Sequence, residues 1–81
     1  MSAGIITIDV HGMNLYQARI KIQSTLRRAD KGVYRIRIVH GFNDGTAIKD
    51  MIADEFTNHY KVQRVISGLN QGQTELLLRE Y

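Results

Sequence analysis

Two stretches of the sequence decide the fold: IITIDVHG at residues 5–12 and VYRIRIVHG at residues 33–41. In both, apolar and polar side chains alternate with the period of two that is typical of a strand with one buried face. Both stretches also end in His-Gly. The sequence therefore predicts two half-buried strands, Ile5–Val10 and Val33–Val39, each leading into a glycine-containing loop.

The segments that follow these loops have helical spacing. Apolar residues recur every three or four positions from about Leu15 to Ala29, and Asn14 with Gln17 three residues later matches a capping box. Gly32 is placed to end this helix. A second apolar stripe predicts a helix from about Thr46 to Tyr60.

The end of the chain predicts a hairpin, with strands Val62–Ile66 and Thr74–Arg79 around a loop rich in Gly, Asn and Gln. The order βαβαββ, with right-handed crossovers, favours a two-layer α/β sandwich: a mixed four-stranded sheet with both helices on one face. The other face is expected to be open and polar. Its predicted members are Thr7, Asp9, Arg35, Arg37, Gln63, Glu75 and Arg79.

Length and composition narrow the function classes. The 81 residues make one domain, residues 1–81, too small to enclose a large substrate cavity. The chain has no cysteine, which excludes disulfides, thiolate zinc sites and a thiol nucleophile and suits a reducing cytoplasm. No apolar run reaches the roughly 18 residues of a membrane span, and the start of the chain lacks the basic residues of a secretory signal. We expect a soluble cytoplasmic protein.

The net charge of +3 is unevenly distributed. Residues 1–40 hold seven Lys/Arg and two Asp/Glu, whereas residues 41–81 hold four and six. The basic half is the candidate partner of a polyanion such as DNA or RNA, although a solvated face has the same composition. The basic residues of the first predicted helix and its end are likewise either a nucleic-acid contact or a solvated face. They are Arg19, Lys21, Arg27, Arg28 and Lys31.

Candidate catalytic residues stand at the two His-Gly strand ends. Asp9 and His11 leave the first strand on the same open face, and His40 ends the second strand. The carboxylate can orient the imidazole or hold a divalent cation, and an imidazole can transfer protons near neutral pH. The structural alternatives are an ion pair of Asp9 with Arg35 or Arg37, and histidines that hold the loops that follow them.

Both loops lead into helix N-termini, which together with nearby backbone N–H groups suit a phosphate. Glycines admit a close ligand, Asn43 supports a tight turn, and Phe42 can stack on a base or fold over the core. A lysine in the first helical turn, Lys49, runs against the helix dipole and favours an anion contact. The candidate nucleic-acid contacts are Gly12, Arg35, Arg37, Gly41, Phe42, Asn43, Gly45 and Lys49.

These motifs resemble those of the Smr (small MutS-related) domain family. Residues 8–12, Ile-Asp-Val-His-Gly, match its Leu-Asp-x-His signature followed by glycine, and residues 36–41 match its second strand ending in His-Gly. Residues 72–76 resemble its Gly-rich turn into the last strand. Many members continue the second His-Gly as x-Gly-Thr-Gly, whereas residues 42–46 read Phe-Asn-Asp-Gly-Thr, so that only Gly45 carries over.

The resemblance implies the same βαβαββ sandwich, nucleic-acid binding and, in several members, endonuclease activity that nicks DNA or cuts RNA. Carried over by position, Asp9 and His11 match the signature acid and histidine, and His40 and Gly41 match the second strand end. Mg²⁺ or Mn²⁺ is the expected cation if one takes part. A binding module without cleavage and a protein-interaction module in DNA repair or translation are the alternative functions.

Overall fold

The computed structural model describes residues 4–41, 46–68 and 70–79, and its elements follow the predicted order βαβαββ. His40-Gly41 comes directly after the second strand, and His11-Gly12 follows the first strand after Val10. The elements are β1 (Ile5–Asp9), α1 (Leu15–Arg28), β2 (Arg35–Val39), α2 (Ala47–Phe56), β3 (Val62–Ser67) and β4 (Gln73–Leu78).

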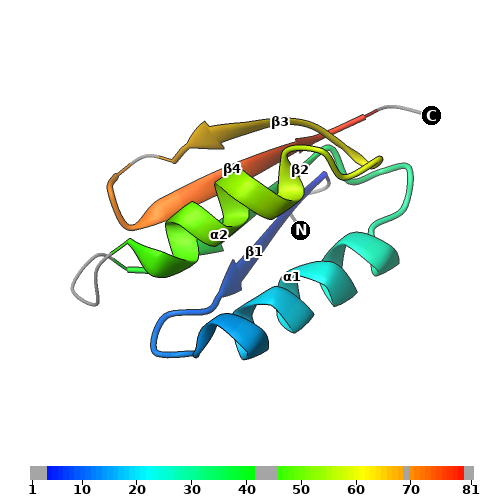
Figure 1. The fold of residues 1–81 in the computed structure, drawn as a ribbon. Coiled ribbons are helices and arrows are strands. Elements are labelled where there is room, and N and C mark those ends of the chain that lie inside the picture. The colour runs from blue at the N-terminus through cyan, green and yellow to red at the C-terminus, as the bar shows by residue number, and fades with distance from the viewer. Residues whose placement is uncertain (1–3, 42–45, 69, 80–81) are drawn as a thin grey trace.

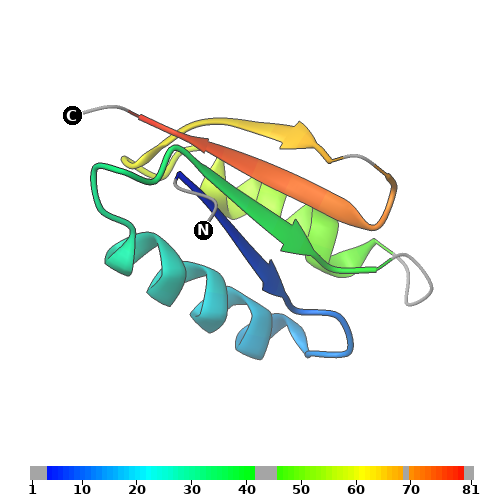
Figure 2. The same cartoon turned by 180° about the vertical axis from the view of Figure 1, so that it is seen from behind.

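The four strands form one mixed sheet in the order β1-β2-β4-β3. β1 and β2 are parallel, as a crossover through α1 requires, and β4 pairs antiparallel with both β2 and β3. Both helices pack on the same face of the sheet (Figure 1), and the view from behind shows the strands in front of them (Figure 2). The predicted two-layer α/β sandwich is confirmed.

The core fills the space between the sheet and the two helices. Fully burying one aliphatic or aromatic side chain contributes about 1.5–3 kcal/mol, so a dozen such residues dominate the stability of a chain this small. The strands and helices contribute to the core in the alternating and helical patterns read from the sequence. The buried apolar residues are Val10, Ala18, Ile22, Leu26, Ile36, Ile38, Met51, Ile52, Phe56, Val62, Leu76 and Leu78.

Helix α2 is shorter than predicted. The sequence pattern extended it to Tyr60, but it ends at Phe56 because the chain turns there to bring Val62 into the core. Two backbone bonds close this turn, from the N–H of His59 to Phe56 and from the N–H of Val62 to His59. The Nδ1 atom of His59 accepts a further bond from the N–H of Lys61 at 3.1 Å.

The face of the sheet opposite the helices differs from the predicted one. The register shifts between Val62 and Arg64, so cross-strand positions on this face are taken by Arg64 and Ile66, and Gln63 falls at the shift. Arg79 lies beyond the end of β4. Ile5, Val39 and Leu77 pair with residues of this face, which is therefore mixed rather than wholly polar.

Candidate functional site

The two His-Gly turns lie against each other at the carboxyl ends of β1 and β2. A Cβ placed on Gly41 would lie 3.6 Å from the Cβ of His11. Gly12 and Gly41 adopt nearly the same left-handed backbone, with φ of +77° and +75°, a region that other residues rarely enter. The repeated sequence thus builds a repeated turn, and the two copies meet as the parallel strand order predicts.

Asp9 holds the side chain of His11 in one orientation. The Oδ1 atom of Asp9 accepts the backbone N–H of His11 at 3.0 Å and lies 2.5 Å from its Nδ1. A carboxylate only accepts, so Nδ1 carries the proton and, in the neutral ring, Nε2 carries the lone pair. Both side chains are accessible to solvent, with 68% of His11 and 54% of Asp9 exposed.

These bonds also fix the charge of Asp9. The hydrogen bonds from the ring and from the backbone N–H of His11 hold the pKa of the Asp9 carboxyl below its usual value. Asp9 is therefore ionised at neutral pH, where its charge favours a positive charge on the neighbouring imidazole.

His40 is buried, unlike His11. Its residue is 5% exposed, its Nδ1 donates to the carbonyl of Gly41 at 2.8 Å, and its Nε2 pairs with the hydroxyl of Thr74 at 2.8 Å. The backbone N–H groups of His40 and Gly41 donate to the carbonyl of Gly72. Both ring nitrogens are engaged, so proton transfer by His40 would require one of these bonds to break.

Thr74 and Gly72 are the part of the site that the sequence reading missed. They belong to the start of β4 and the turn before it, which lie beside β2 in the sheet. A signal was present, because alternation places Thr74 on the buried face with Leu76, and a buried hydroxyl needs a partner. Nothing in the sequence indicated that the partner would be His40.

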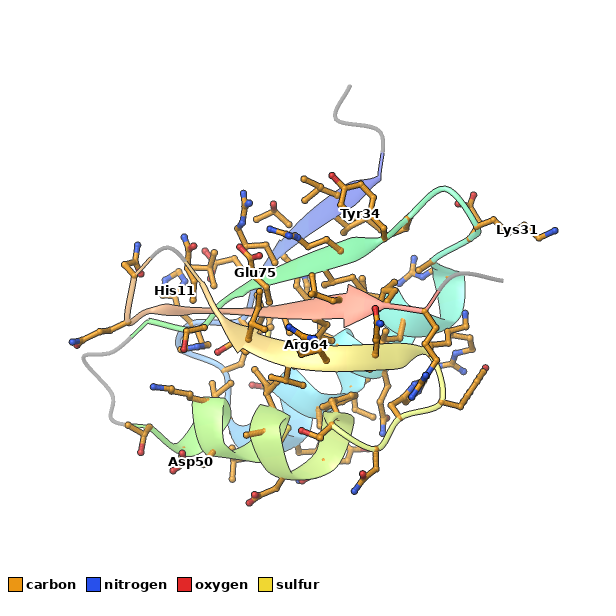
Figure 3. The ribbon with its side chains drawn as sticks, turned by 90° about the horizontal axis from the view of Figure 1, so that it is seen from above. His11, Lys31, Tyr34, Asp50, Arg64 and Glu75 are labelled. Atoms are coloured by element: carbon orange, nitrogen blue, oxygen red, sulfur yellow. The ribbon has the colours of Figure 1, made fainter. Side chains whose placement is uncertain are left out.

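Arg35 and Arg37 are engaged by a buried acid on the open face. Arg35 Nη1 donates to Glu75 Oε1 at 2.8 Å, and Arg37 Nε donates to Glu75 Oε2 at 3.0 Å. Glu75 is 2% exposed, whereas the two arginine side chains are 32% and 27% exposed. Glu75 lies toward the middle of the sheet and His11 at one end (Figure 3). Arg37 pairs across the sheet with Thr7, which lies two residues before Asp9. Arg37 and Asp9 are therefore separated by about 7 Å along the strand direction.

The two helix N-termini at this edge differ. In α1, the predicted capping box forms, with Gln17 N donating to Asn14 Oδ1 and Asn14 N donating to Gln17 Oε1. In α2, the Thr46 hydroxyl donates to Asp50 at 3.0 Å and does not cap the first turn. A hollow of about 190 Å³ lies between them. It is lined by Met13, Asn14, Leu15, His40, Gly41, Ala47 and Ile48.

The structure thus brings together Asp9, His11, Gly12 and Gly41, with His40 buried beneath them. Lys49 is exposed in the first turn of α2. Three predicted contacts, Phe42, Asn43 and Gly45, lie outside the described residues. Within residues 4–41, 46–68 and 70–79, no group of three His, Cys, Asp or Glu is arranged to hold a metal ion.

The comparisons with known proteins identify the family and the fold. A family model described as the Smr domain matches residues 8–75. The crystal structure of the Smr domain of Thermus thermophilus MutS2 is similar with a TM-score of 0.83, at 20% identity, over 91% of this chain and 98% of that one. No curated protein matches. Among the described residues, no helix is long and apolar enough to cross a membrane.

Proposed function

Because this chain belongs to the Smr domain family, we propose that it binds nucleic acid at the carboxyl ends of β1 and β2 and cleaves its phosphodiester backbone there. The observation that carries the proposal is the exposed imidazole of His11, held by the ionised Asp9 on a turn packed against Gly41. An oriented, solvent-accessible imidazole is the arrangement that proton transfer to or from a bound ligand requires.

Features around this pair suit a phosphate. Gly12 and Gly41 have no side chain to keep the ligand from the backbone. Lys49 and the N-terminus of α2 supply positive charge on one side. On the sheet, the guanidinium of Arg37 donates through Nε to Glu75, and Arg37 pairs with Thr7, two residues before Asp9.

Cleavage follows from the tautomer of His11. Nε2 takes a proton from the attacking oxygen, of water or of a ribose 2′-hydroxyl, and Asp9 stabilises the resulting imidazolium through Nδ1. The attacking oxygen bonds to phosphorus as the bond from phosphorus to the leaving oxygen breaks, and the leaving oxygen takes a proton from solvent.

In this proposal His40 is a positioning residue. Its bonds to Gly41 and Thr74 tie the end of β2 to β4 and so fix the turn against which His11 packs. A role in proton transfer, predicted for His40 from its place at the strand end, is not needed.

The test is a binding and cleavage assay on labelled single-stranded RNA, duplex DNA and branched DNA, at low salt, with and without Mg²⁺ or Mn²⁺. The wild type is compared with Asp9→Ala, His11→Ala and, as a control acid on the exposed side of α2, Asp54→Ala. We expect the wild type and Asp54→Ala to bind and cleave, and the two site variants to lose cleavage. A wild type that binds none of the three substrates would contradict the proposal; binding without cleavage would remove its catalytic half.

A second candidate is protein interaction, favoured by apolar side chains exposed on α1. Leu15, Tyr16 and Ile20 are 41%, 68% and 44% exposed. Tyr16 and Ile20 line a hollow of about 390 Å³. A stoichiometric protein partner that co-purifies after nuclease treatment, and is lost in Tyr16→Ser/Ile20→Ser, would support this function.

A further inference from the structure

A second positively charged surface lies at the carboxyl end of α1, opposite the Asp9–His11 edge. Figure 3 shows Lys31 of this surface and His11 at opposite ends of the molecule. The 14 residues of α1 separate the two ends by about 21 Å. We call this surface the basic end. It comprises Arg27, Arg28, Lys31, Lys61 and Arg79.

Lys61 makes this end of the helix positive. Its Nζ donates to the carbonyls of Leu26 at 2.8 Å, Ala29 at 3.3 Å and Arg27 at 3.4 Å. A helix C-terminus carries a partial negative charge on such carbonyls and would repel an anion. Capped by Lys61, and with Arg27 and Arg28 in its last turn, the end of α1 attracts one instead.

Three of the basic residues, Lys31, Lys61 and Arg79, line a hollow of about 310 Å³. The backbone N–H of Arg79 donates to the carbonyl of Lys61, which keeps the two residues adjacent. Asp30 also lines the hollow, and its carboxylate accepts the N–H of Gly32 at 2.9 Å. Among the residues that the structure describes, three cations thus face one acid at this hollow.

An aromatic pair adjoins these charges. The rings of His59 and Tyr60 stack with centroids 4.9 Å apart and an angle of 18° between their planes. Tyr60 is 70% exposed, and the pair lines a hollow of about 320 Å³ with Gln23 and Arg27. Burial, and then the charge of Lys61, lower the pKa of His59, so its ring is neutral at pH 7. The pair therefore offers an aromatic surface rather than another charge.

We propose that the basic end is a second nucleic-acid contact, where Arg27 and Lys31 neutralise phosphates and Tyr60 stacks on an unpaired base. Basic side chains beside an exposed aromatic ring are the combination that single-stranded nucleic acid requires. A duplex offers its phosphates but no exposed base to Tyr60. This inference rests on the proposed function and adds a direction to it: a strand runs along α1 from the Asp9–His11 edge to the basic end.

The test measures binding of a labelled single strand of about 16 nucleotides, within the range that a small single-strand-binding domain covers. At about 3.4 Å per stacked nucleotide, about six span the 21 Å between the two ends. Arg27→Gln/Lys31→Gln is compared with Arg64→Glu, which lowers the net charge by the same two units on the sheet, away from α1. Thermal unfolding confirms that both variants fold, as expected for exposed residues.

We expect the basic-end variant to bind about tenfold more weakly at low salt. Its slope of log affinity against log salt should fall by about 1.4, or about 0.7 for each lost phosphate contact on a single strand. The control variant should keep the wild-type slope. Tyr60→Ala should also weaken binding about tenfold, Tyr60→Phe should not, and neither should alter binding to a duplex of equal length.

Equal slopes for Arg27→Gln/Lys31→Gln and Arg64→Glu would overturn the basic end as a contact. A Tyr60→Ala variant with wild-type affinity would overturn the stacking role. Polyglutamate that competes as well as the oligonucleotide would overturn nucleic acid as the ligand in favour of an acidic protein segment. A wild type that binds no nucleic acid sinks the proposed function as well, whereas normal binding by Arg27→Gln/Lys31→Gln sinks this inference alone.

Discussion

His11 and Gly41 come from different strand ends, yet a Cβ on Gly41 would lie only 3.6 Å from the Cβ of His11. The imidazole is therefore positioned from two sides: Asp9 holds its Nδ1, and the second His-Gly turn packs against its Cβ. Gly12 has nearly the same backbone conformation as Gly41, but nothing lies within 4 Å of the place where its Cβ would be. A comparison of the two glycines therefore distinguishes the effect of backbone strain from the effect of contact with His11.

Gly41→Ala and Gly12→Ala should therefore differ in activity more than in stability. Each forces an alanine into the left-handed region, which destabilises the protein by about 1–2 kcal/mol, measured by urea denaturation. Only the Gly41 variant also brings a methyl group into van der Waals contact with His11, so it should show the larger change in cleavage or affinity. Equal losses of activity in the two variants would mean that the packing of the turns does not orient His11.

The lowered pKa of Asp9 gives a pH dependence with a definite sign. The bonds from His11 hold the folded-state pKa of Asp9 below the usual value of about 3.9, so its contribution to stability is fully present above that value. The contribution disappears as the pH falls through the folded-state pKa. The difference in unfolding free energy between wild type and Asp9→Asn should therefore shrink as the pH falls below about 4.

NMR titration of the Asp9 carboxyl checks the cause directly. In His11→Ala, the ring bond that contributes most to the shift is absent, so the pKa of Asp9 should move back toward its usual value. Neutral His11 in the wild type should carry its proton on Nδ1, and that preference should weaken in Asp9→Asn. An unchanged Asp9 titration in His11→Ala would show that the two side chains do not interact in solution.

Much of the fold could be predicted because its signals are local. Period-two alternation in IITIDVHG and the Asn14–Gln17 capping box each depend on neighbouring residues, and both formed as read. The register shift in β3 could not be read, since a bulge depends on cross-strand pairing that alternation does not encode. The end of α2 was misplaced because apolar spacing continued beyond Phe56 while the chain had to turn into β3.

The candidate site was predictable only in part, for a related reason. The parallel direction of β1 and β2 places Asp9 and His11 at the same edge of the sheet as Gly41. The order of the strands therefore predicts that these residues lie close together. The partners from β4 were not predictable, since β4 inserts between β2 and β3 only when the last hairpin folds back. As a result, Glu75 was read as an exposed residue of the open face, although it is buried between Arg35 and Arg37.

Glu75→Gln should destabilise the protein far more than Glu55→Gln, although both remove a carboxylate bound to arginine. Glu75 is 2% exposed and holds two guanidinium groups, whereas Glu55 is paired with Arg19 at the surface. Removing one partner of a fully buried pair costs 3–5 kcal/mol, and because both arginines reach solvent we expect about 2 kcal/mol for Glu75→Gln. Chemical denaturation measures the difference.

Salt distinguishes the two cases further. The small loss in Glu55→Gln should shrink as salt rises, because exposed pairs are screened, while the loss in Glu75→Gln should persist. Equal, salt-sensitive losses would mean that the Glu75 carboxylate is hydrated in solution.

His40→Ala should mainly lower the stability of the protein, whereas His11→Ala should mainly remove cleavage. His40 is 5% exposed and bonds to Gly41 and Thr74, so its removal leaves the buried Thr74 hydroxyl without its partner and should destabilise the protein by about 2–3 kcal/mol. His11 is exposed, and its removal should leave the unfolding free energy within about 0.5 kcal/mol of the wild type. Both variants are measured at about 10 °C, where they stay folded enough to assay.

At that temperature, His40→Ala should retain cleavage in proportion to its folded fraction, because a positioning residue acts through the turn it supports. His11→Ala should be folded and inactive. Thr74→Val completes a double-mutant cycle with His40→Ala. If His40 acts through its bond to Thr74, the variant with both substitutions should be little less stable than His40→Ala alone. A His40→Ala variant that keeps wild-type stability but loses cleavage would instead make His40 a direct participant in proton transfer, and the buried bonds seen here would have to open during turnover.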